Sequence, residues 1–158
     1  MEKTNAMRNL DQKKIKYEVH YYDENEAVSG VEVANVLHED VNKLFKTLVT
    51  VGKSKKNYVF LVPGDEELDL KKAAKLANEK SIEMVKSKEL LPLTGYIHGG
   101  CSPVGMKKLF KTFIHKSAED FDTIFISGGK RGIQIELNIH DLMKVVPMTL
   151  GELIVVKE

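Results

Sequence analysis

The chain has 158 residues, of which 42% are hydrophobic and 30% are charged, a composition typical of one domain with a packed core and not of a disordered chain. Its 24 lysines and arginines against 23 aspartates and glutamates give a net charge of +1, which excludes a histone-like binder and an acidic tail protein. The single cysteine, Cys101, excludes an internal disulfide framework, and no apolar run or signal-peptide pattern indicates a membrane segment. We therefore expect a single cytoplasmic domain over residues 1–158.

The N-terminal half alternates between helical and strand-like apolar periodicity. Ser29 and Glu32 fit a capping box, and Thr4 and Asp69 are predicted to begin two further helices. In the helix after Asp69, the predicted buried stripe is Leu70, Ala73, Ala74 and Ala77. The expected elements are a helix at 4–13, a strand at 17–22, a helix from Ser29 to about His38, a hairpin of strands 44–51 and 58–63, and a helix at 70–78.

The C-terminal half contains mostly short strands with short connections. Asn138 is expected to cap the last helix, which ends near Val145. The other expected elements are a strand at 81–85, a short helix that Ser87 caps and that ends before Pro92, strands at 111–115, 123–127 and 134–137, and a terminal strand at 153–156. The pattern predicts an α/β (α+β) domain in which helices surround a mixed, mostly antiparallel, partly barrel-like sheet.

Two glycine-rich segments are the first candidates for a functional site. They contain Gly99-Gly100 and Gly128-Gly129. Paired glycines let backbone amides approach a ligand closely, and successive amides can hold an anion or a developing oxyanion. The alternative is that each pair only forms a tight turn between strands. Neither segment has P-loop or dinucleotide-binding spacing, so nucleoside triphosphate and nicotinamide enzymes are not indicated.

Lys46 is the one lysine inside an otherwise apolar strand segment, residues 44–49. Lysine is seldom buried without a partner, so its side chain either emerges on a solvated sheet face or points into a cleft. In a cleft, the ammonium could hold a phosphate or ribose, or stabilise negative charge on an ester that is being cleaved.

Cys101 and His98 are each open to two interpretations. Cys101 is either a nucleophile or, as lone cysteines more often are, a small buried thiol. His98 is either a core or rim residue or a general base. The five histidines lack His-Glu-x-x-His spacing, so we predict no metal site and no cofactor.

Lysines gather in clusters, whereas acidic residues concentrate at 23–26 and 65–69. Together with Lys130 and Arg131, the clusters form either ordinary solvated faces or a surface that contacts phosphates. The clusters are at positions 13, 14 and 16, at 53, 55 and 56, at 71, 72 and 75, and at 107, 108 and 111.

Four segments, taken in order, resemble the YbaK/EbsC family of Cys-tRNA(Pro) deacylases, relatives of the editing domain of bacterial prolyl-tRNA synthetases. Their order and spacing fit from the first helix to about Val145, nearly the whole chain, and the combination is far more specific than any one segment. The segments are Leu44-Phe45-Lys46-Thr47-Leu48, Leu68-Asp69-Leu70-Lys71-Lys72-Ala73-Ala74, residues 93–105 and residues 126–133.

The resemblance implies an enzyme of translation fidelity that removes cysteine from mischarged proline tRNA in trans, and cysteine tRNA is a further possible substrate. Cysteine and proline are similar in size, so a synthetic site cannot exclude cysteine strongly. In the family, the substrate thiol is thought to attack its own ester carbonyl and leave as a thiolactone, and the protein supplies orientation and oxyanion donors. The expected class is an aminoacyl-tRNA deacylase, either a hydrolase or a lyase.

The resemblance also implies roles for individual residues. Lys46 would hold the terminal adenosine or its phosphate, and amides around Gly99 and Gly100 would receive the oxyanion. The implied aminoacyl pocket is lined by Thr47, Ser127, Gly128 and Gly129, with His20, Tyr21, Ser29 and Gln134 as further substrate-binding residues.

The chain departs from the family pattern at four of these positions. His20 stands where relatives often have a tyrosine, with Tyr21 and Tyr22 beside it, and the sequence leaves open which ring, if any, reaches the substrate. Gln134 replaces an aspartate that many relatives have, and a neutral amide can hydrogen-bond a substrate amine but cannot form an ion pair with it. Ser29 replaces a bulkier apolar residue, and Cys101 replaces an aliphatic one, which favours the small buried thiol.

Three other functions remain alternatives on the sequence. The chain could deacylate alanine or another small amino acid on tRNA, or bind tRNA or a synthetase without catalysis. A thiol enzyme or redox sensor based on Cys101 is the third. The expected partner is aminoacyl-tRNA, and prolyl-tRNA synthetase is a second candidate.

Overall fold

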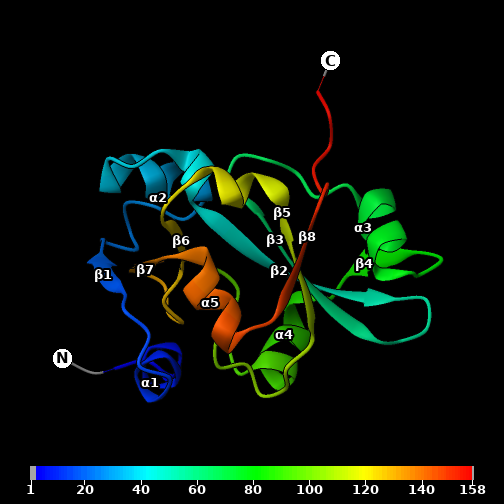
Figure 1. Cartoon of the computed structure of the whole chain (residues 1–158), viewed down its shortest axis with the longest axis horizontal. Helices are drawn as coiled ribbons and strands as arrows, with labels where there is room; N and C mark the ends of the chain where they lie inside the picture. Colours follow the sequence, from blue (N-terminus) through cyan, green and yellow to red (C-terminus); the bar gives the residue numbers. More distant parts are fainter. Residues whose placement is uncertain (1–2, 158) are drawn as a thin grey trace.

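The structure, a computed structural model, describes residues 3–157, so both ends of the expected domain, residues 1–2 and 158, lie outside it. In residues 3–157, eight strands form two sheets, and five α-helices pack around them (Figure 1). Within the described residues, no helix has the length and apolar character needed to span a membrane.

The larger sheet has five strands in the order β4-β2-β3-β5-β8, and the smaller sheet has three in the order β1-β7-β6. The pairs β3–β5 and β5–β8 are parallel, and the other paired strands are antiparallel. The predicted mixed, mostly antiparallel architecture is therefore confirmed, and residues 3–157 form no closed barrel. The strands are β1 (Glu18–Tyr21), β2 (Phe45–Gly52), β3 (Asn57–Pro63), β4 (Ile82–Met84), β5 (Lys111–His115), β6 (Ile124–Ser127), β7 (Ile133–Leu137) and β8 (Met148–Gly151).

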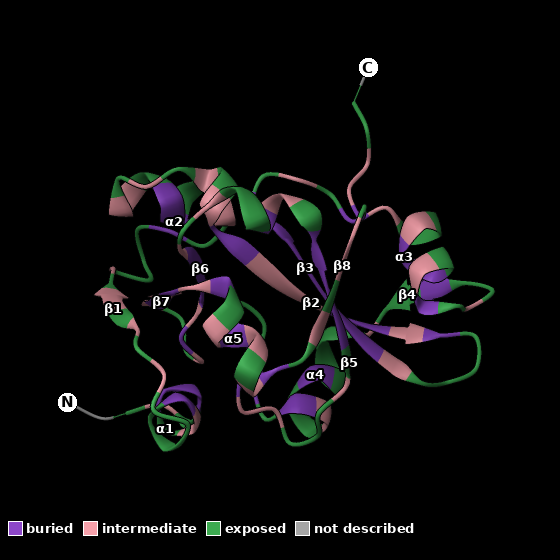
Figure 2. Ribbon diagram, viewed as in Figure 1, coloured by how far each residue is buried: buried purple, intermediate pink, exposed green. Residues whose placement is uncertain are grey.

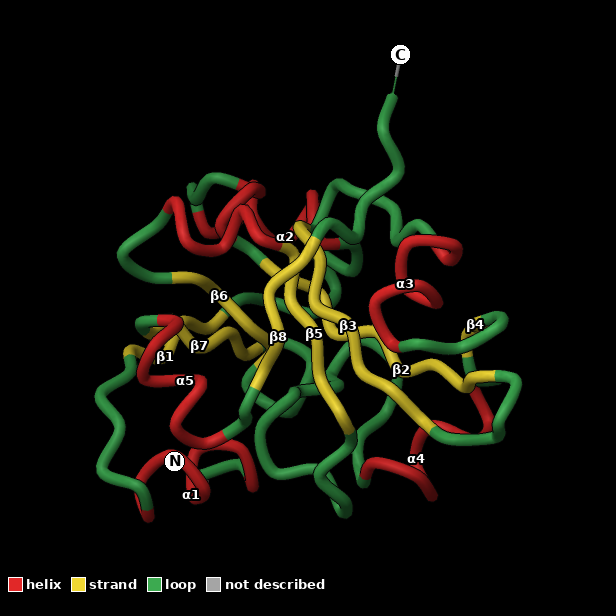
Figure 3. The backbone as a smooth tube through the Cα atoms, turned by 45° about the vertical axis from the view of Figure 1, so that its right-hand side comes forward, coloured by secondary structure: helices red, strands yellow, loops and turns green. Residues whose placement is uncertain are grey.

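The two sheets meet at one point, where Leu44 at the start of β2 forms an isolated parallel bridge with Phe125 of β6. Beyond it, β2 pairs with β3 in the larger sheet, whereas β6 pairs with β7 in the smaller one. Both bridging residues are buried in a small cluster with Val33 and Ala34. Figure 3 shows the smaller sheet, β1, β7 and β6, beside the larger one.

The predicted helix starts are confirmed at four caps. Thr4, Asp69 and Asn138 each accept hydrogen bonds from backbone amides of the first turn. Ser29 and Glu32 form the complete capping box. The helices are α1 (Asn5–Gln12), α2 (Gly30–Leu37), α3 (Leu70–Ala77), α4 (Ser87–Thr94) and α5 (Ile139–Val145), with 3-10 turns at Val41–Lys43 and Lys116–Asp120.

The predicted start and end of α4 were wrong. Lys86 is the N-cap position and makes no side-chain cap, and Pro92 lies inside the helix. Pro92 has no N–H and so cannot donate to the Lys88 carbonyl one turn earlier. Nearby, Thr94 Oγ1 donates to the Leu90 carbonyl at 2.8 Å. Leu90 is buried and anchors this helix on the main core.

Two other predictions need correction. Leu70 is 41% exposed, because it begins α3 on the outer side of the stripe formed by Ala73, Ala74 and Ala77. The last strand is Met148–Gly151, which pairs with β5, and residues 153–156 contribute only a bridge between Ile154 and Leu68. The parallel edge of β5 is filled before the chain reaches Leu153, which packs on the core instead.

The main core lies between α1, the faces of both sheets and α5, as the buried residues of Figure 2 show. A second cluster lies under α3, where Phe60 and Phe113 stack at 5.2 Å between ring centroids. These cores fix β2, β3 and β6, the strands that border the cavity described below.

The start of α2 depends on a close backbone contact between Gly30 and Gly64. A Cβ atom at position 30 would lie 2.8 Å from the Gly64 Cα, closer than real Cβ contacts. Because backbone atoms cannot rotate away, we expect Gly30→Ala to destabilise the fold by about 1–3 kcal/mol through overpacking. Urea unfolding measures this loss.

Asn35→Ala, on an exposed position of the same helix, is the matched control and should change stability by less than about 0.5 kcal/mol. Equal stability of Gly30→Ala and the natural protein would show that the contact is not tight.

Candidate functional site

A cavity of about 540 Å³ opens where β2 and β6 separate. One side is formed by α2 and Gly64, and the other by the start of α4 and the turn at residues 98–101. Residues 45–49 of β2 line it, and β6 and β7 contribute Ser127 and Gln134.

Six of the residues expected at the site lie on this cavity, although they come from five separate parts of the chain. They are Ser29, Lys46, Thr47, Gly99, Ser127 and Gln134. The other five expected residues, His20, Tyr21, Gly100, Gly128 and Gly129, do not line it.

The pairing of β1 with β7 and a polar contact explain why His20 and Tyr21 do not line the cavity. His20 is opposite Gln134 and shares its sheet face, but its Nε2 lies 3.0 Å from Glu136 Oε1. Tyr21 is opposite Ile133, on the other face, and is 49% exposed. The neighbouring Tyr22 lines the cavity instead.

The amides of the three other glycines are engaged in turns. Gly100 N–H donates to the Ile97 carbonyl at 3.0 Å, and Gly128 N–H donates to the Ile133 carbonyl at 2.9 Å. Gly129 N–H donates to Ser127 Oγ at 3.2 Å. In contrast, the Gly99 amide donates to no group within residues 3–157.

The two glycine turns lie side by side. A Cβ atom at Gly100 would lie 3.1 Å from the Lys130 Cα. Arg131 Nε donates to the His98 carbonyl at 2.9 Å. Gly99 has a φ of +87°, which its turn requires and which other residues rarely adopt. The two turns therefore pack against each other beside the cavity, which Gly99 and Ser127 line.

Lys46 of β2 lines the cavity and is half-buried, and no ion pair found within residues 3–157 includes it. Burial lowers the pKa of its ammonium below 10.5, and the nearby carboxylates of Asp65, Glu67 and Glu66 partly oppose this shift. A cation held in such surroundings interacts more strongly with an anionic or polar ligand than it would in water.

Two polar atoms of residues that line the cavity lack hydrogen-bond partners. Thr47 Oγ1 and Gln134 Oε1 are inaccessible to solvent and make no hydrogen bond within the described chain. Gln134 is only 6% exposed. Because a buried polar atom without a partner costs free energy, both atoms are candidates to hydrogen-bond a ligand, Gln134 Oε1 as an acceptor and Thr47 Oγ1 as a donor or an acceptor.

Comparison with known proteins decides the family. The model of the aminoacyl-tRNA editing domain matches residues 24–145. The chain belongs to the aminoacyl-tRNA editing domain family. It is 47% identical over 137 residues to a candidate Cys-tRNA(Pro)/Cys-tRNA(Cys) deacylase, EbsC of Enterococcus faecalis, a match that covers 86% of this chain and 84% of that protein.

More distant similarities agree with this family. A proline–tRNA ligase of Thermosipho africanus is 34% identical over 79 residues, 49% of this chain and 14% of the ligase. A crystal structure described as a candidate trans-editing enzyme for prolyl-tRNA synthetase has a TM-score of 0.84 at 22% identity, covering 99% of this chain and 100% of that chain. The latter likeness establishes the editing-domain fold.

Several cavity residues of this editing domain were not predicted from the sequence. They include Gly64, Met84 and Val85. Gly64 is placed there by its contact with Gly30 and by the hydrogen bond from its amide to the Leu44 carbonyl, and residues 84–85 reach the cavity because β4 pairs with the far half of β2. No local pattern carries such long-range contacts.

The structure also gathers Glu18, His20 and Glu136, whose potential ligand atoms all lie within 4.8 Å of one another. These three side chains could hold a metal ion. However, Glu136 already accepts from Thr123 Oγ1, and Lys43 Nζ lies 3.9 Å from its Oε2. A neighbouring ammonium opposes a second cation, so the cluster is better described as a hydrogen-bonded ion-pair network.

The charged ammonium of Lys46 should lower the stability of the folded protein. Because its folded-state pKa is lowered, folding is penalised while the ammonium is charged, and this penalty disappears as the pH rises through the lowered pKa towards 10.5. We expect Lys46→Met to be more stable at pH 7 by roughly 0.5–1 kcal/mol, with a smaller gain near pH 10. Urea unfolding at both pH values measures it.

The control is Lys53→Met on the exposed β2–β3 turn, which should be neutral within about 0.5 kcal/mol. A less stable Lys46→Met variant would show that the ammonium has a stabilising partner.

Cys101 lines the cavity as a buried thiol, and burial raises its pKa to about 12. Because only the thiolate reacts, we expect native Cys101 to alkylate with iodoacetamide at pH 8 at least about 100-fold more slowly than in the unfolded chain. Mass spectrometry over time follows the reaction. Rapid native labelling would contradict the assigned burial and protonation.

Proposed function

We propose that this protein deacylates Cys-tRNA(Pro) in trans and so removes cysteine attached in error to proline tRNA. The observation that carries the proposal is the cavity itself, which Lys46, Thr47 and Gln134 line and in which Thr47 Oγ1 and Gln134 Oε1 lack hydrogen-bond partners within the described residues. The 47% identity to EbsC, named as a candidate deacylase of Cys-tRNA(Pro) and Cys-tRNA(Cys), supports the same substrate class.

The polar atoms match the groups of an aminoacyl ester. Gln134 Oε1 can only accept, and the α-ammonium of the amino acid is a donor. Thr47 Oγ1 can either donate or accept, and it lies one residue from Lys46 on β2. The cavity volume of about 540 Å³ accommodates an amino acid with its ribose and leaves longer RNA outside.

Lys46 is assigned to the terminal nucleotide, where its ammonium holds the phosphate or ribose and fixes the ester. Its partial burial strengthens this contact, since the effective dielectric constant is lower than that of water. Positioning of this kind converts attack within one bound molecule into a favourable unimolecular step.

We propose that the substrate supplies the nucleophile. Its thiol sulfur bonds to the ester carbonyl carbon, the bond from that carbon to the ribose oxygen breaks, and the thiol proton passes to that oxygen. The products are cysteine thiolactone and tRNA. The Gly99 amide is assigned as an oxyanion donor, because it is free and lies on the cavity, whereas the Gly100 amide is used within its turn.

The state of Cys101 supports a substrate nucleophile over a protein nucleophile. A thiol with a pKa of about 12 is almost wholly protonated at neutral pH. Cys101 is therefore assigned to shaping the wall beside the aminoacyl group. The reaction belongs in the cytoplasm, where aminoacyl-tRNA is used, and association with prolyl-tRNA synthetase remains a prediction.

The deciding experiment is single-turnover deacylation of proline tRNA charged with cysteine, serine or alanine, with product analysis. We expect Cys-tRNA(Pro) to be cleaved at least about 100-fold faster than the Ser form, because a hydroxyl is a far weaker nucleophile than a thiol. The amino-acid product should be thiolactone that then hydrolyses.

Two variants control the assignment of the site. Lys46→Met should lose most of its activity although it stays folded, and Cys101→Ala should keep it. Equal rates on serine and cysteine would remove the substrate-thiol mechanism, and preference for alanine would change the substrate. Binding of tRNA without any turnover would identify a binding module.

A further inference from the structure

Acidic residues border one side of the cavity. Residues 17–42 contain seven aspartates and glutamates and no lysine or arginine, and they include the cavity residues Tyr22, Ser29 and Gly30. Residues 64–69 contain four more acidic residues and again no lysine or arginine. The contact of Gly30 with Gly64 brings these two segments together. We call residues 23–26 and 65–67 the acidic rim.

Basic residues border the opposite side. No aspartate or glutamate occurs in residues 90–118 or 123–135, which supply the cavity residues of the two glycine turns. Lys130 and Arg131 are exposed directly beside the 98–100 turn. Lys107 is exposed and lies against the C-terminal end of α4, where its Nζ donates to the Pro92 carbonyl at 3.4 Å. Its Cγ would lie 3.5 Å from a Cβ at Gly95, three residues before the 98–100 turn. We call Lys107, Lys130 and Arg131 the basic rim.

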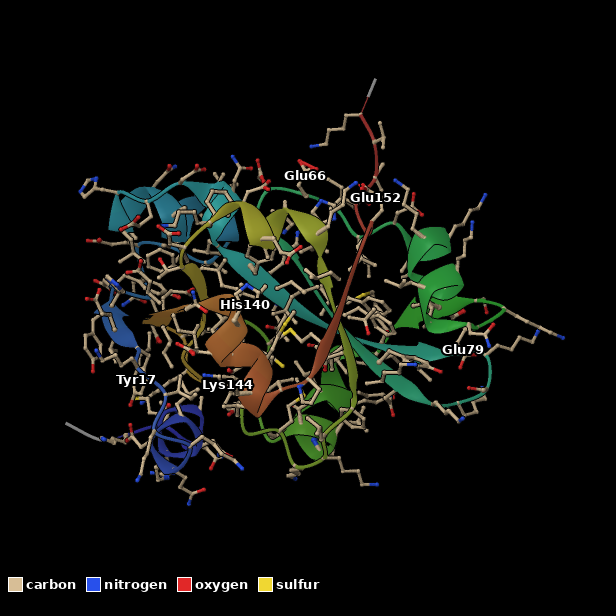
Figure 4. All side chains as sticks on the ribbon, viewed as in Figure 1. Tyr17, Glu66, Glu79, His140, Lys144 and Glu152 are labelled. Carbon is tan, nitrogen blue, oxygen red and sulfur yellow. The ribbon has the colours of Figure 1, made fainter. Side chains whose placement is uncertain are left out.

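The charges of the basic rim are not neutralised within the described chain. Within residues 3–157, no ion pair involves Lys107, Lys130 or Arg131, and Arg131 donates one N–H to the His98 carbonyl. Some lysines elsewhere are paired, among them Lys72 and Lys116, which both contact Glu152. Figure 4 shows Glu152 near Glu66, at the end where the C-terminal segment emerges. Unlike Glu152, Glu66 has no ion pair with any group in residues 3–157.

We propose that the RNA attached to the aminoacyl ester leaves the cavity over the basic rim, with its backbone phosphates against Lys107, Lys130 and Arg131, while the acidic rim repels it from the other side. The inference rests on the proposed function, since it names the surface that holds the remainder of that substrate. A phosphodiester chain is the fitting partner, because it carries a regular row of anions that exposed cations bind without sequence preference.

The two rims also set the direction in which the RNA lies. At physiological salt, charges act over about 8 Å, so each rim acts mainly on the nucleotides nearest the cavity mouth. The carboxylates of the acidic rim lie close enough to Lys46 to influence its pKa. Phosphates that passed over that side would therefore meet repulsion directly at the mouth.

The test measures binding of an acceptor-stem RNA hairpin that carries no amino acid to the charge-reversal variant Lys107→Glu/Lys130→Glu. We expect the affinity of this variant for the hairpin at low salt to be at least about tenfold lower than that of the natural protein. The magnitude of the slope of log affinity against log salt should decrease by about 1.4–1.8 for two lost phosphate contacts. The matched control is Lys53→Glu/Lys75→Glu, two exposed lysines without ion pairs on the β2–β3 turn and on α3, which should bind as the natural protein does. Arg131 is left in place because it supports the turn.

A second substrate separates this inference from the proposed function. Cysteinyl-adenosine ester has no phosphate, so the basic-rim variant should cleave it at the natural rate within about twofold while it loses Cys-tRNA(Pro) cleavage. The double variant Glu24→Gln/Glu66→Gln should bind the hairpin equally or more tightly.

The inference would be overturned if the basic-rim variant bound the hairpin as tightly as the natural protein does, or if neutralising the acidic rim weakened binding. Either result would leave the proposed function standing. An equal loss in the Lys53→Glu/Lys75→Glu control would also overturn it, since the effect would then be general. If the natural protein cleaved neither ester, the proposed function would fail, and the hairpin measurements would still decide which rim binds RNA.

Discussion

The bridge between Leu44 and Phe125 is the constraint on which the site depends. It joins β2 and β6 for one residue, after which each strand pairs within its own sheet. Continued pairing would bring the strands to the usual spacing of about 4.8 Å and leave no space for a ligand. Because the bridge is buried and packed by α2, the strands separate from a fixed point, and the width of the cavity is set by the fold.

Local signals in the sequence predicted the parts of the fold that are governed by local contacts. The caps at Thr4, Ser29, Asp69 and Asn138 depend on residues within one helical turn, and all four formed. The last strand failed because two neighbouring apolar segments competed for one edge, and parallel pairing with β5 selected residues 148–151. Residues 153–156 have the stronger β-branched pattern, but strand propensity is decided by the available neighbours.

The same distinction explains the site. Lys46 could be singled out because a charge in an apolar strand is a local anomaly, and the family resemblance added Thr47, Ser127 and Gln134. The choice among three consecutive aromatic rings could not be made locally, because a shift of one residue moves a side chain to the other sheet face. The register of β1 against β7 turns Tyr21 outward, and Tyr22 follows the strand into the cavity wall.

The close contacts at the cavity mouth join loops of like charge. Gly30 meets Gly64 between two acidic segments, and Gly100 meets Lys130 between two acid-free ones. Like charges brought together oppose folding, and a surface shaped for stability and solubility alone would intersperse the two signs. Each contact needs a glycine, so the arrangement also constrains the backbone. This arrangement produces an electrostatic field across the mouth of the cavity. Such a field acts on a ligand that carries charge along its length. The loops in which like charges repel are thus the same loops that form the entrance. The shape of the cavity is therefore linked to the direction from which a polyanion can reach it.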